Sequence, residues 1–179
     1  MDIDFTVEKN INIYSDITNK KKSEITVCIL NRPRHSKIIS ELKRLDVNVK
    51  PITDGDVSGA LLVSDKKYNV DIFMGIGGGP EGVIAAAALD SLNCNFQGRF
   101  LFKTDTDIKR AKDMGIEDLN KKYEINEIVS GESFFCATGI TSGELMNGVI
   151  KEDNNYITET IFTYNKSALK VIKKKISLT

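Results

Sequence analysis

A glycine-rich loop between a predicted strand and a predicted helix most constrains what this chain can fold into. The loop runs from Met74 to Gly82 and contains five glycines. Residues 69–73 before it are rich in side chains typical of a buried strand, and residues 83–89 after it are rich in alanine, the best helix former. Glycine permits positive φ angles and lets a ligand approach the backbone amides. A strand, a glycine turn and a helix N-terminus together predict an anion-binding site.

Two residues at the start of the predicted helix refine the chemistry of that site. Pro80 suits the first helical position, where no N–H is needed. Glu81 lies in the first turn, where the helix dipole favours a carboxylate, although the same charge would repel a bare phosphate. A metal ion would be attracted to Glu81 and would in turn attract a phosphate. The loop therefore predicts a metal-assisted phosphate site.

Predicted strands and helices alternate along most of the chain, which indicates an α/β domain with a mostly parallel or mixed sheet flanked by helices. The predicted helices are 6–18, 36–45, 57–63, 83–89 and 105–114. The predicted strands are 25–30, 47–52, 69–73, 96–102 and 133–137. From Gly148 onward the pattern becomes strand-like at 149–151, 156–164 and 169–176, with turn signals at 153–155 and 165–167, so we expect an antiparallel hairpin region. No linker interrupts the sequence, and a single domain over 1–179 is expected.

Composition excludes several classes of protein. The chain has 25 Lys and Arg against 25 Asp and Glu, so its net charge of zero draws it neither to nucleic acid nor to a membrane. The longest apolar run, 83–89, is too short to cross a bilayer, and the acidic N-terminus lacks the plan of a signal peptide. Cys28, Cys94 and Cys136 are widely spaced, which predicts reduced, buried thiols in a cytoplasmic protein rather than metal ligands.

Three loops that follow predicted strands carry polar and charged residues, and each has a proline in it or close to it. Ligands of open α/β sheets bind at the carboxyl ends of the strands, so we expect these loops to meet at one edge. Arginine forks bind phosphate, and aspartates accept hydrogen bonds from hydroxyl groups. The mixture suits a sugar phosphate. The loops contain Arg32, Pro33 and Arg34, then Asp54, Gly55 and Asp56 after Pro51, then Pro80 and Glu81.

The sequence leaves other interpretations of these residues open. The two arginines are also explained as surface charges, and Asp54 or Asp56 as a cap of the helix at 57. His35, the only histidine, is better explained as an N-cap neighbour or a packed ring than as a general base. The segment 138–143 is either a turn or a source of hydroxyl groups for the site, and the lysines at 173–175 indicate a solvated strand end.

A dinucleotide-binding module is an alternative function for the glycine loop. The spacing from Gly77 to Gly82 satisfies G-x-G-x-x-G, and Asp105 follows about 20 residues further on, after the next predicted strand. Glu81 argues against this function, because a pyrophosphate would lie beside an uncompensated carboxylate. No G-K-[ST] sequence follows the loop, which excludes a P-loop.

Six motifs in one order, covering essentially the whole chain, resemble the class II fructose-1,6-bisphosphatases. The motifs are Leu30-Asn31-Arg32-Pro33-Arg34-His35, Thr53-Asp54-Gly55-Asp56-Val57, Met74-Gly75-Ile76-Gly77-Gly78-Gly79-Pro80-Glu81-Gly82, Gln97-Gly98-Arg99, Arg110-Ala111-Lys112-Asp113-Met114-Gly115 and Ala137-Thr138-Gly139-Ile140-Thr141-Ser142-Gly143. The resemblance implies the layered α/β architecture of the lithium-sensitive sugar phosphatases. It also implies a phosphatase that uses manganese or magnesium and forms a homo-oligomer when complete.

The activity that this resemblance implies is hydrolysis of fructose 1,6-bisphosphate to fructose 6-phosphate in gluconeogenesis. Some relatives also act on sedoheptulose 1,7-bisphosphate. A metal-activated water would attack the phosphorus at C1. By similarity, Glu81 matches a metal ligand. The positions that match substrate-holding residues of the family are Arg32, Pro33, Arg34, Asp54, Gly55, Asp56 and Gly78.

The chain departs from the family in two respects. Asn31 stands where the family usually has aspartate. Family chains are about twice this length, and their N-terminal half carries an Asp-Pro-Ile-Asp-Gly-Thr-like motif with most of the metal ligands, which this sequence lacks. We therefore expect a C-terminal half, beginning at an internal-looking Met1, that needs the other half for activity. A non-catalytic remnant is the alternative.

Overall fold

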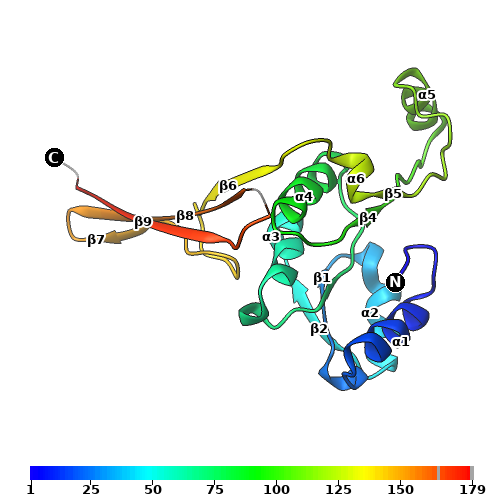
Figure 1. Cartoon of the computed structure of the whole chain (residues 1–179), viewed down its shortest axis with the longest axis horizontal. Helices are drawn as coiled ribbons and strands as arrows, with labels where there is room; N and C mark the ends of the chain where they lie inside the picture. The colour runs from blue at the N-terminus through cyan, green and yellow to red at the C-terminus, as the bar shows by residue number, and fades with distance from the viewer. Residues whose placement is uncertain (165, 178–179) are drawn as a thin grey trace.

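The computed structural model describes residues 1–164 and 166–177, and within them helices and strands alternate (Figure 1). The α-helices are α1 (Val7–Thr18), α2 (Ser36–Arg44), α3 (Asp56–Leu61), α4 (Gly79–Ser91), α5 (Asp105–Asp113) and α6 (Ile125–Ile128). The 3-10 helices are η1 (Lys22–Glu24), η2 (Pro33–His35), η3 (Leu62–Ser64) and η4 (Lys66–Tyr68). The strands are β1 (Thr26–Leu30), β2 (Asn48–Ile52), β3 (Ile72–Phe73), β4 (Gln97–Gly98), β5 (Tyr123–Glu124), β6 (Phe134–Thr138), β7 (Ile150–Glu152), β8 (Asn155–Tyr164) and β9 (Lys170–Ser177). The predicted α/β class is confirmed.

A three-stranded parallel sheet in the order β2-β1-β3 forms the centre of the N-terminal part. The central strand, β1, has four buried residues out of five, as its near-continuous apolar sequence requires. Leu30 of β1 pairs with Ile52 of β2, and Cys28 pairs with Phe73 of β3. The carboxyl ends of the three strands therefore lie at one edge of the sheet.

Helices cover both faces of the parallel sheet. Successive side chains of a strand point to opposite faces, so Val27 packs with Ile11 of α1 and Leu42 of α2, while Cys28 packs on the other side with the cluster of α3 and α4. Helix α4 is apolar around most of its surface, and its buried alanines allow close packing between α3 and the C-terminal strands. The layers are therefore α1 and α2, the parallel sheet, α3 and α4, and a second sheet.

The second sheet is the predicted antiparallel C-terminal region, and it is covered only on one face, along β6 and the end of β8. Strand β8 pairs with β6 and β7 along one edge and with β9 along the other. Ile161 and Thr163 of β8 are fully buried against the α4 side. The opposite face, which we call the open face, carries Phe134, Phe162 and Ile172. Figure 1 shows this sheet extending away from the rest of the molecule.

The predicted strand at 96–102 is wrong over most of its length. Only Gln97–Gly98 forms a strand, and it pairs antiparallel with β5 rather than joining the parallel sheet. Aromatic residues of this segment make side-chain contacts instead, since the ring of Phe100 packs edge-on against Tyr123 at 5.7 Å and lies 6.1 Å from Phe102. Neither β5 nor α6 was predicted from the sequence. Of the predicted turn at 165–167, Asn165 lies outside the described residues.

The three thiols differ in exposure. Cys28 is buried, Cys94 is half-buried and Cys136 is exposed, and all three are free. The prediction of buried thiols is therefore wrong for Cys136, because its side chain points to the open face of the C-terminal sheet. Burial raises the pKa of the Cys28 thiol to about 11. Among the described residues, no helix has the length and apolar character needed to span a membrane.

Candidate functional site

The loops after β1 and β2 approach each other at the carboxyl edge of the parallel sheet. The Asn31 amide donates to the Ile52 carbonyl at 2.8 Å, which extends the pairing of the two strands by one residue. Beyond it, Arg32 Nη2 lies 3.9 Å from Asp54 Oδ1. Both side chains are exposed, at 44% and 90%, so this ion pair is weak and leaves both groups accessible to a ligand.

The glycine loop after β3 lies against both of these loops. Arg34 Nε donates to the Ile76 carbonyl at 2.6 Å, which ties the first loop to the third. A Cβ atom at Gly77 would clash with Asp56 Oδ2, so the Asp56 carboxylate lies directly against the glycine backbone. The three loops that we expected to meet are therefore together at one edge.

His35 holds the glycine loop in place. Its ring is fully buried. The Ile76 amide donates to His35 Nε2 at 2.8 Å, which makes that nitrogen an acceptor. The proton of the neutral ring is therefore on Nδ1, which donates to the Leu30 carbonyl at 2.7 Å. His35 is a packed residue at the N-cap of α2, as predicted, and it joins the end of β1 to the glycine loop, a role the sequence did not reveal.

The start of α4 presents backbone amides and one carboxylate. Gly78 is the N-cap, and as a glycine it has no side chain to cap the helix. The Glu81 carboxylate folds back so closely that a Cβ atom at Gly78 would clash with Glu81 Oε2. The glycines of this loop do not adopt positive φ, so close approach explains them rather than unusual dihedral angles. Pro80 is the second helical residue rather than the first, because α4 begins at Gly79.

Gly55 is the turn residue of the second loop. Its φ of 85° favours glycine, and the Asp54 carboxylate accepts from the Gly55 amide at 2.9 Å. Helix α3 begins at Asp56 with Gly55 as its N-cap and has no side-chain capping bond. Neither aspartate is therefore a cap, and Asp56 faces the glycine loop from the first turn of α3.

A complete divalent-cation site is not present in the part of the chain that the structure describes. No group of three or more His, Cys, Asp or Glu side chains there is arranged to hold a metal ion. Glu81 is exposed at the start of α4, and its carboxylate is chemically suited to Mn²⁺ or Mg²⁺. Such ions require about six oxygen ligands, so Glu81 fits the role of one ligand and not that of a whole site.

The segment after β6 packs beside the parallel sheet. Thr138 pairs its hydroxyl with that of Thr160 at 2.8 Å, and the Gly148 amide donates to Ser142 Oγ at 3.0 Å. Lys50 of β2 reaches Glu144 at 2.8 Å. These contacts describe a compact turn, and they do not bring its hydroxyl groups to the glycine loop.

The Gln97-Gly98-Arg99 motif anchors the N-terminal residues, an arrangement that sequence reasoning missed. Arg99 Nη2 lies 2.5 Å from Asp4 Oδ1, and the Ile3 amide donates to the Gln97 side chain at 2.9 Å. Lys122 pairs with Asp2 at 2.5 Å. The partners are more than 90 residues apart in sequence, so local pattern carries no signal for them.

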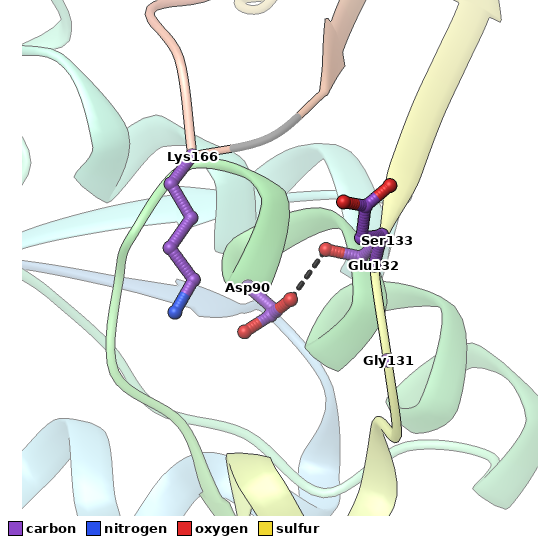
Figure 2. Close-up of a pocket in the computed structure, with 5 residues that line it drawn as sticks. All are labelled: Asp90, Gly131, Glu132, Ser133 and Lys166. Carbon is purple, nitrogen blue, oxygen red and sulfur yellow. Dashed lines mark hydrogen bonds between the residues drawn. The ribbon is translucent and has the colours of Figure 1, made fainter.

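Two small cavities lie among the described residues, and Asn31 of the first loop lines one of them. One, of about 210 Å³, lies on the α2 side of β1 and β2. The other, of about 90 Å³, lies at the far end of α4 from Glu81, where Asp90 accepts a hydrogen bond from Ser133 and Lys166 lines the opposite wall (Figure 2). Asp90 is nine residues after Glu81, or about 14 Å along the helix, so the second cavity is separate from the three loops.

The residues that the structure describes do not provide the structural context of a dinucleotide fingerprint. The strand that follows α4, β4, pairs with β5 and is not part of the parallel sheet. Asp105 therefore does not lie at the tip of a neighbouring parallel strand, where it would reach a ribose. Figure 1 shows α5, which begins at Asp105, at the end of an extension away from α4.

Comparison with known proteins identifies the family. Residues 1–176 match the family described as "Bacterial fructose-1,6-bisphosphatase, glpX-encoded". Proteins named D-fructose 1,6-bisphosphatase class 2/sedoheptulose 1,7-bisphosphatase are similar to this chain. The one from Trichodesmium erythraeum is 38% identical over 93% of this chain and 52% of its own length. The one from Synechococcus sp. (strain JA-2-3B'a(2-13)) is 38% identical over 92% and 51%, and the one from Prochlorococcus marinus is 37% identical over 83% and 49%.

The extent of these matches agrees with the predicted resemblance to half of a family chain. The chain spans about half the length of the curated relatives it matches, while the family match covers nearly all of its own 179 residues. On the breadth of that match, the chain belongs to the glpX-encoded bacterial fructose-1,6-bisphosphatase family.

Proposed function

We propose that this chain is the substrate-holding half of a metal-dependent sugar bisphosphatase. In this proposal the complete enzyme is a phosphoric monoester hydrolase of the cytoplasm that removes one phosphate from fructose 1,6-bisphosphate or sedoheptulose 1,7-bisphosphate. The single observation that carries it is the meeting of three loops at the carboxyl edge of the parallel sheet, in a chain of this family. Most of the metal ligands would come from the family segment that this chain does not span.

The two arginines are proposed to hold a substrate phosphate. The hydrogen bond from Arg34 Nε to the Ile76 carbonyl fixes the plane of the guanidinium, and the remaining N–H donors match the oxygens of a phosphate. Arg32 stands beside it on the same exposed loop. Amides at the start of α4 add donors of the right polarity for an anion.

The acidic residues are proposed to bind the sugar hydroxyl groups and the cation. Asp54 and Asp56 would accept hydrogen bonds from sugar hydroxyl groups, with Gly55 and Gly78 leaving room for the substrate to approach. Glu81 would provide one carboxylate ligand to Mn²⁺ or Mg²⁺. When bound, such a cation supplies an activated water and neutralises charge on the phosphate oxygens. Glu81 next to a phosphate is favourable only with that neutralisation.

A reconstitution assay tests the proposal. Phosphate release from fructose 1,6-bisphosphate is measured with Mn²⁺ for chain 1–179 alone and after joining it, in one polypeptide, to the segment of the Trichodesmium erythraeum relative outside the match. We expect little turnover alone and Mn²⁺-dependent turnover in the joined protein. Rapid Mn²⁺-dependent turnover by chain 1–179 alone would contradict the need for a second half, and none in a folded joined protein would contradict the function.

Substitution of Glu81 tests the metal ligand in that joined protein. Glu81→Gln keeps the shape and removes the charge, so folding should change by only about 0.3–1 kcal/mol of helix-dipole interaction. Turnover at ordinary Mn²⁺ should fall by orders of magnitude, and the Mn²⁺ concentration needed should rise. Glu117→Gln, at an exposed position, is the control. Unchanged turnover and Mn²⁺ dependence in Glu81→Gln would refute the assignment.

Substitution of Arg34 tests how the phosphate is held. Arg34→Ala should raise KM about 10-fold to 100-fold with kcat little changed, because a phosphate held equally in ground and transition states contributes uniform binding. Arg44→Ala is the control, since Arg44 pairs with Glu8 on the outside of α2. A large fall in kcat with KM unchanged would show that Arg34 acts on the reacting phosphate.

A further inference from the structure

The open face of the C-terminal sheet is a surface that the proposed site does not use. Residues paired across antiparallel strands point to the same face. The register therefore places Phe134 and Tyr164, and with them Phe162, Ile172 and Ile176, on the face turned away from α4. Phe134 is 64% exposed and Ile172 is 51% exposed. A sheet face that meets only water is normally polar. This face instead places large aromatic and aliphatic side chains among its threonines and lysines.

The open face is large and partly preorganised. The ten residues of β8 span about 34 Å, and three strands about 4.8 Å apart give roughly 300 Å² of projected sheet. That area includes threonines and lysines as well as the aromatic and aliphatic side chains, and exposed apolar side chains gathered on one face in this way are typical of interaction sites. The rings of Phe134 and Tyr164 lie 6.5 Å apart, and Lys170 Nζ lies 5.6 Å from the Tyr164 ring and 5.7 Å from that of Phe162.

The charge of the open face indicates what kind of surface would cover it. Lys151, Lys170 and Lys174 point to this face. Among the residues that the structure describes, no Asp or Glu of the four strands does so, since Glu152 and Glu159 lie at positions that point to the other face. Two copies placed face to face would bring like charges together, which is unfavourable. A complementary partner is apolar and carries carboxylates at its edge.

We propose that the open face binds the part of the family fold that this chain does not span. This chain covers 52% and 51% of two relatives, so a segment of similar size remains to be placed. The parallel sheet is already covered on both faces by helices of this chain. The C-terminal sheet lacks a layer on one face, and a segment of that size with an apolar, acidic surface supplies it. The interface does not depend on which sugar phosphate the site accepts.

The thiol of Cys136 reports on this interface. It is exposed and paired with Phe162 on the open face. Its alkylation by iodoacetamide is followed by peptide mass spectrometry in chain 1–179 alone and in the joined protein described above, with Met114→Cys, on a residue 78% exposed at the end of α5, as the internal control. We expect Cys136 to react at least about tenfold more slowly in the joined protein, with the control thiol unchanged.

A charge substitution provides the second measurement. Phe134→Glu introduces a carboxylate into the open face without disturbing the core, and it should restore Cys136 reactivity in the joined protein, whereas Met114→Glu should not. Equal Cys136 reactivity in chain 1–179 and the joined protein overturns the proposal. Protection that grows with the concentration of chain 1–179 alone overturns the proposed occupant in favour of a second copy. Protection of Cys136 without phosphatase activity supports the interface and contradicts the proposed function, so the two failures are distinguishable.

Discussion

The two main sheets of this chain differ in how completely the chain covers them. The parallel sheet has α1 and α2 on one face and α3 and α4 on the other, and four of the five residues of β1 are buried. In the C-terminal sheet, α4 covers β6 and the end of β8 on one face, the other face meets solvent, and every residue of β9 is exposed. Strands with apolar residues therefore occur both in a buried core and on an exposed sheet face. Which of these a strand occupies depends on the elements that pack against it.

Polar side chains at the two sheets differ in the same way, since those at the parallel sheet are enclosed and those on the open face are exposed. At the two ends of the parallel sheet, His35 and Asp71 are largely enclosed and have several partners. On the open face, the hydroxyl pair of Thr138 and Thr160 is exposed. Buried hydrogen-bonded groups are costly to disturb, because a partner left unpaired loses its solvation as well. Exposed groups exchange a protein partner for water at little cost.

The largest expected effect compares two isoleucines on adjacent strands. Ile161 is fully buried on the covered face, so Ile161→Ala should lower the free energy of unfolding by about 2–5 kcal/mol. Ile172 is 51% exposed on the open face, so Ile172→Ala should change it by less than about 0.5 kcal/mol. Urea unfolding of chain 1–179 measures both. Equal losses would show that the open face is covered in solution.

The next effect concerns the residue that holds the glycine loop. His35→Ala leaves the Ile76 amide and the Leu30 carbonyl without their buried partner, and it should cost about 2–4 kcal/mol of unfolding free energy. Hydrogen exchange at Ile76 should accelerate at the same time. Ser36→Ala, at an exposed neighbour, is the control. A His35→Ala protein as stable as that control would contradict the bridging role.

Asp71 provides a pH-dependent comparison at the opposite end of the parallel sheet. Burial acts to raise its pKa, but hydrogen bonds from Lys20, the Thr26 amide and Tyr14 outweigh it and hold the pKa below the ordinary value of an aspartate. A depressed carboxyl pKa stabilises the fold above the unfolded value, and this stabilisation is lost as pH falls through the folded pKa.

Asp71→Asn should therefore lower stability near neutral pH by about 1–3 kcal/mol and flatten the loss of stability below about pH 4. Thermal unfolding between pH 7 and pH 3, with the exposed Asp16→Asn as the control, measures the difference. The same acid-dependent slope in wild type and Asp71→Asn would show that another group dominates this pH range.

A small effect is also expected at the hydroxyl pair of the open face. Thr160→Val removes the hydroxyl that pairs with Thr138 at 2.8 Å and keeps a β-branched side chain, so stability should change by only about 0.2–1 kcal/mol. Urea unfolding again measures it. A loss as large as that of His35→Ala would show that this hydroxyl pair is shielded from solvent and that the open face is misidentified.

The sequence by itself determined the local elements and the location of the candidate site. Apolar runs predicted β1 and β2 within a residue or two, because a strand buried on both faces leaves a continuous signal. Glycine, proline and aspartate after those strands predicted the edge at which the loops meet. The motifs around Arg32, Asp54 and Glu81 predicted the family that the comparison established.

Tertiary structure decided the pairing, the coverage and the roles that depend on distant partners. The run at 96–102 has strand-like composition but finds only β5 as a partner, so most of it is not a strand. His35 binds Ile76, 41 residues away, and no local pattern encodes that contact. Cys136 lies in an apolar segment and is nevertheless exposed, because the register of β6 with β8 points its side chain away from α4. Sequence pattern records whether a residue can be buried, whereas burial itself depends on which elements pack against it.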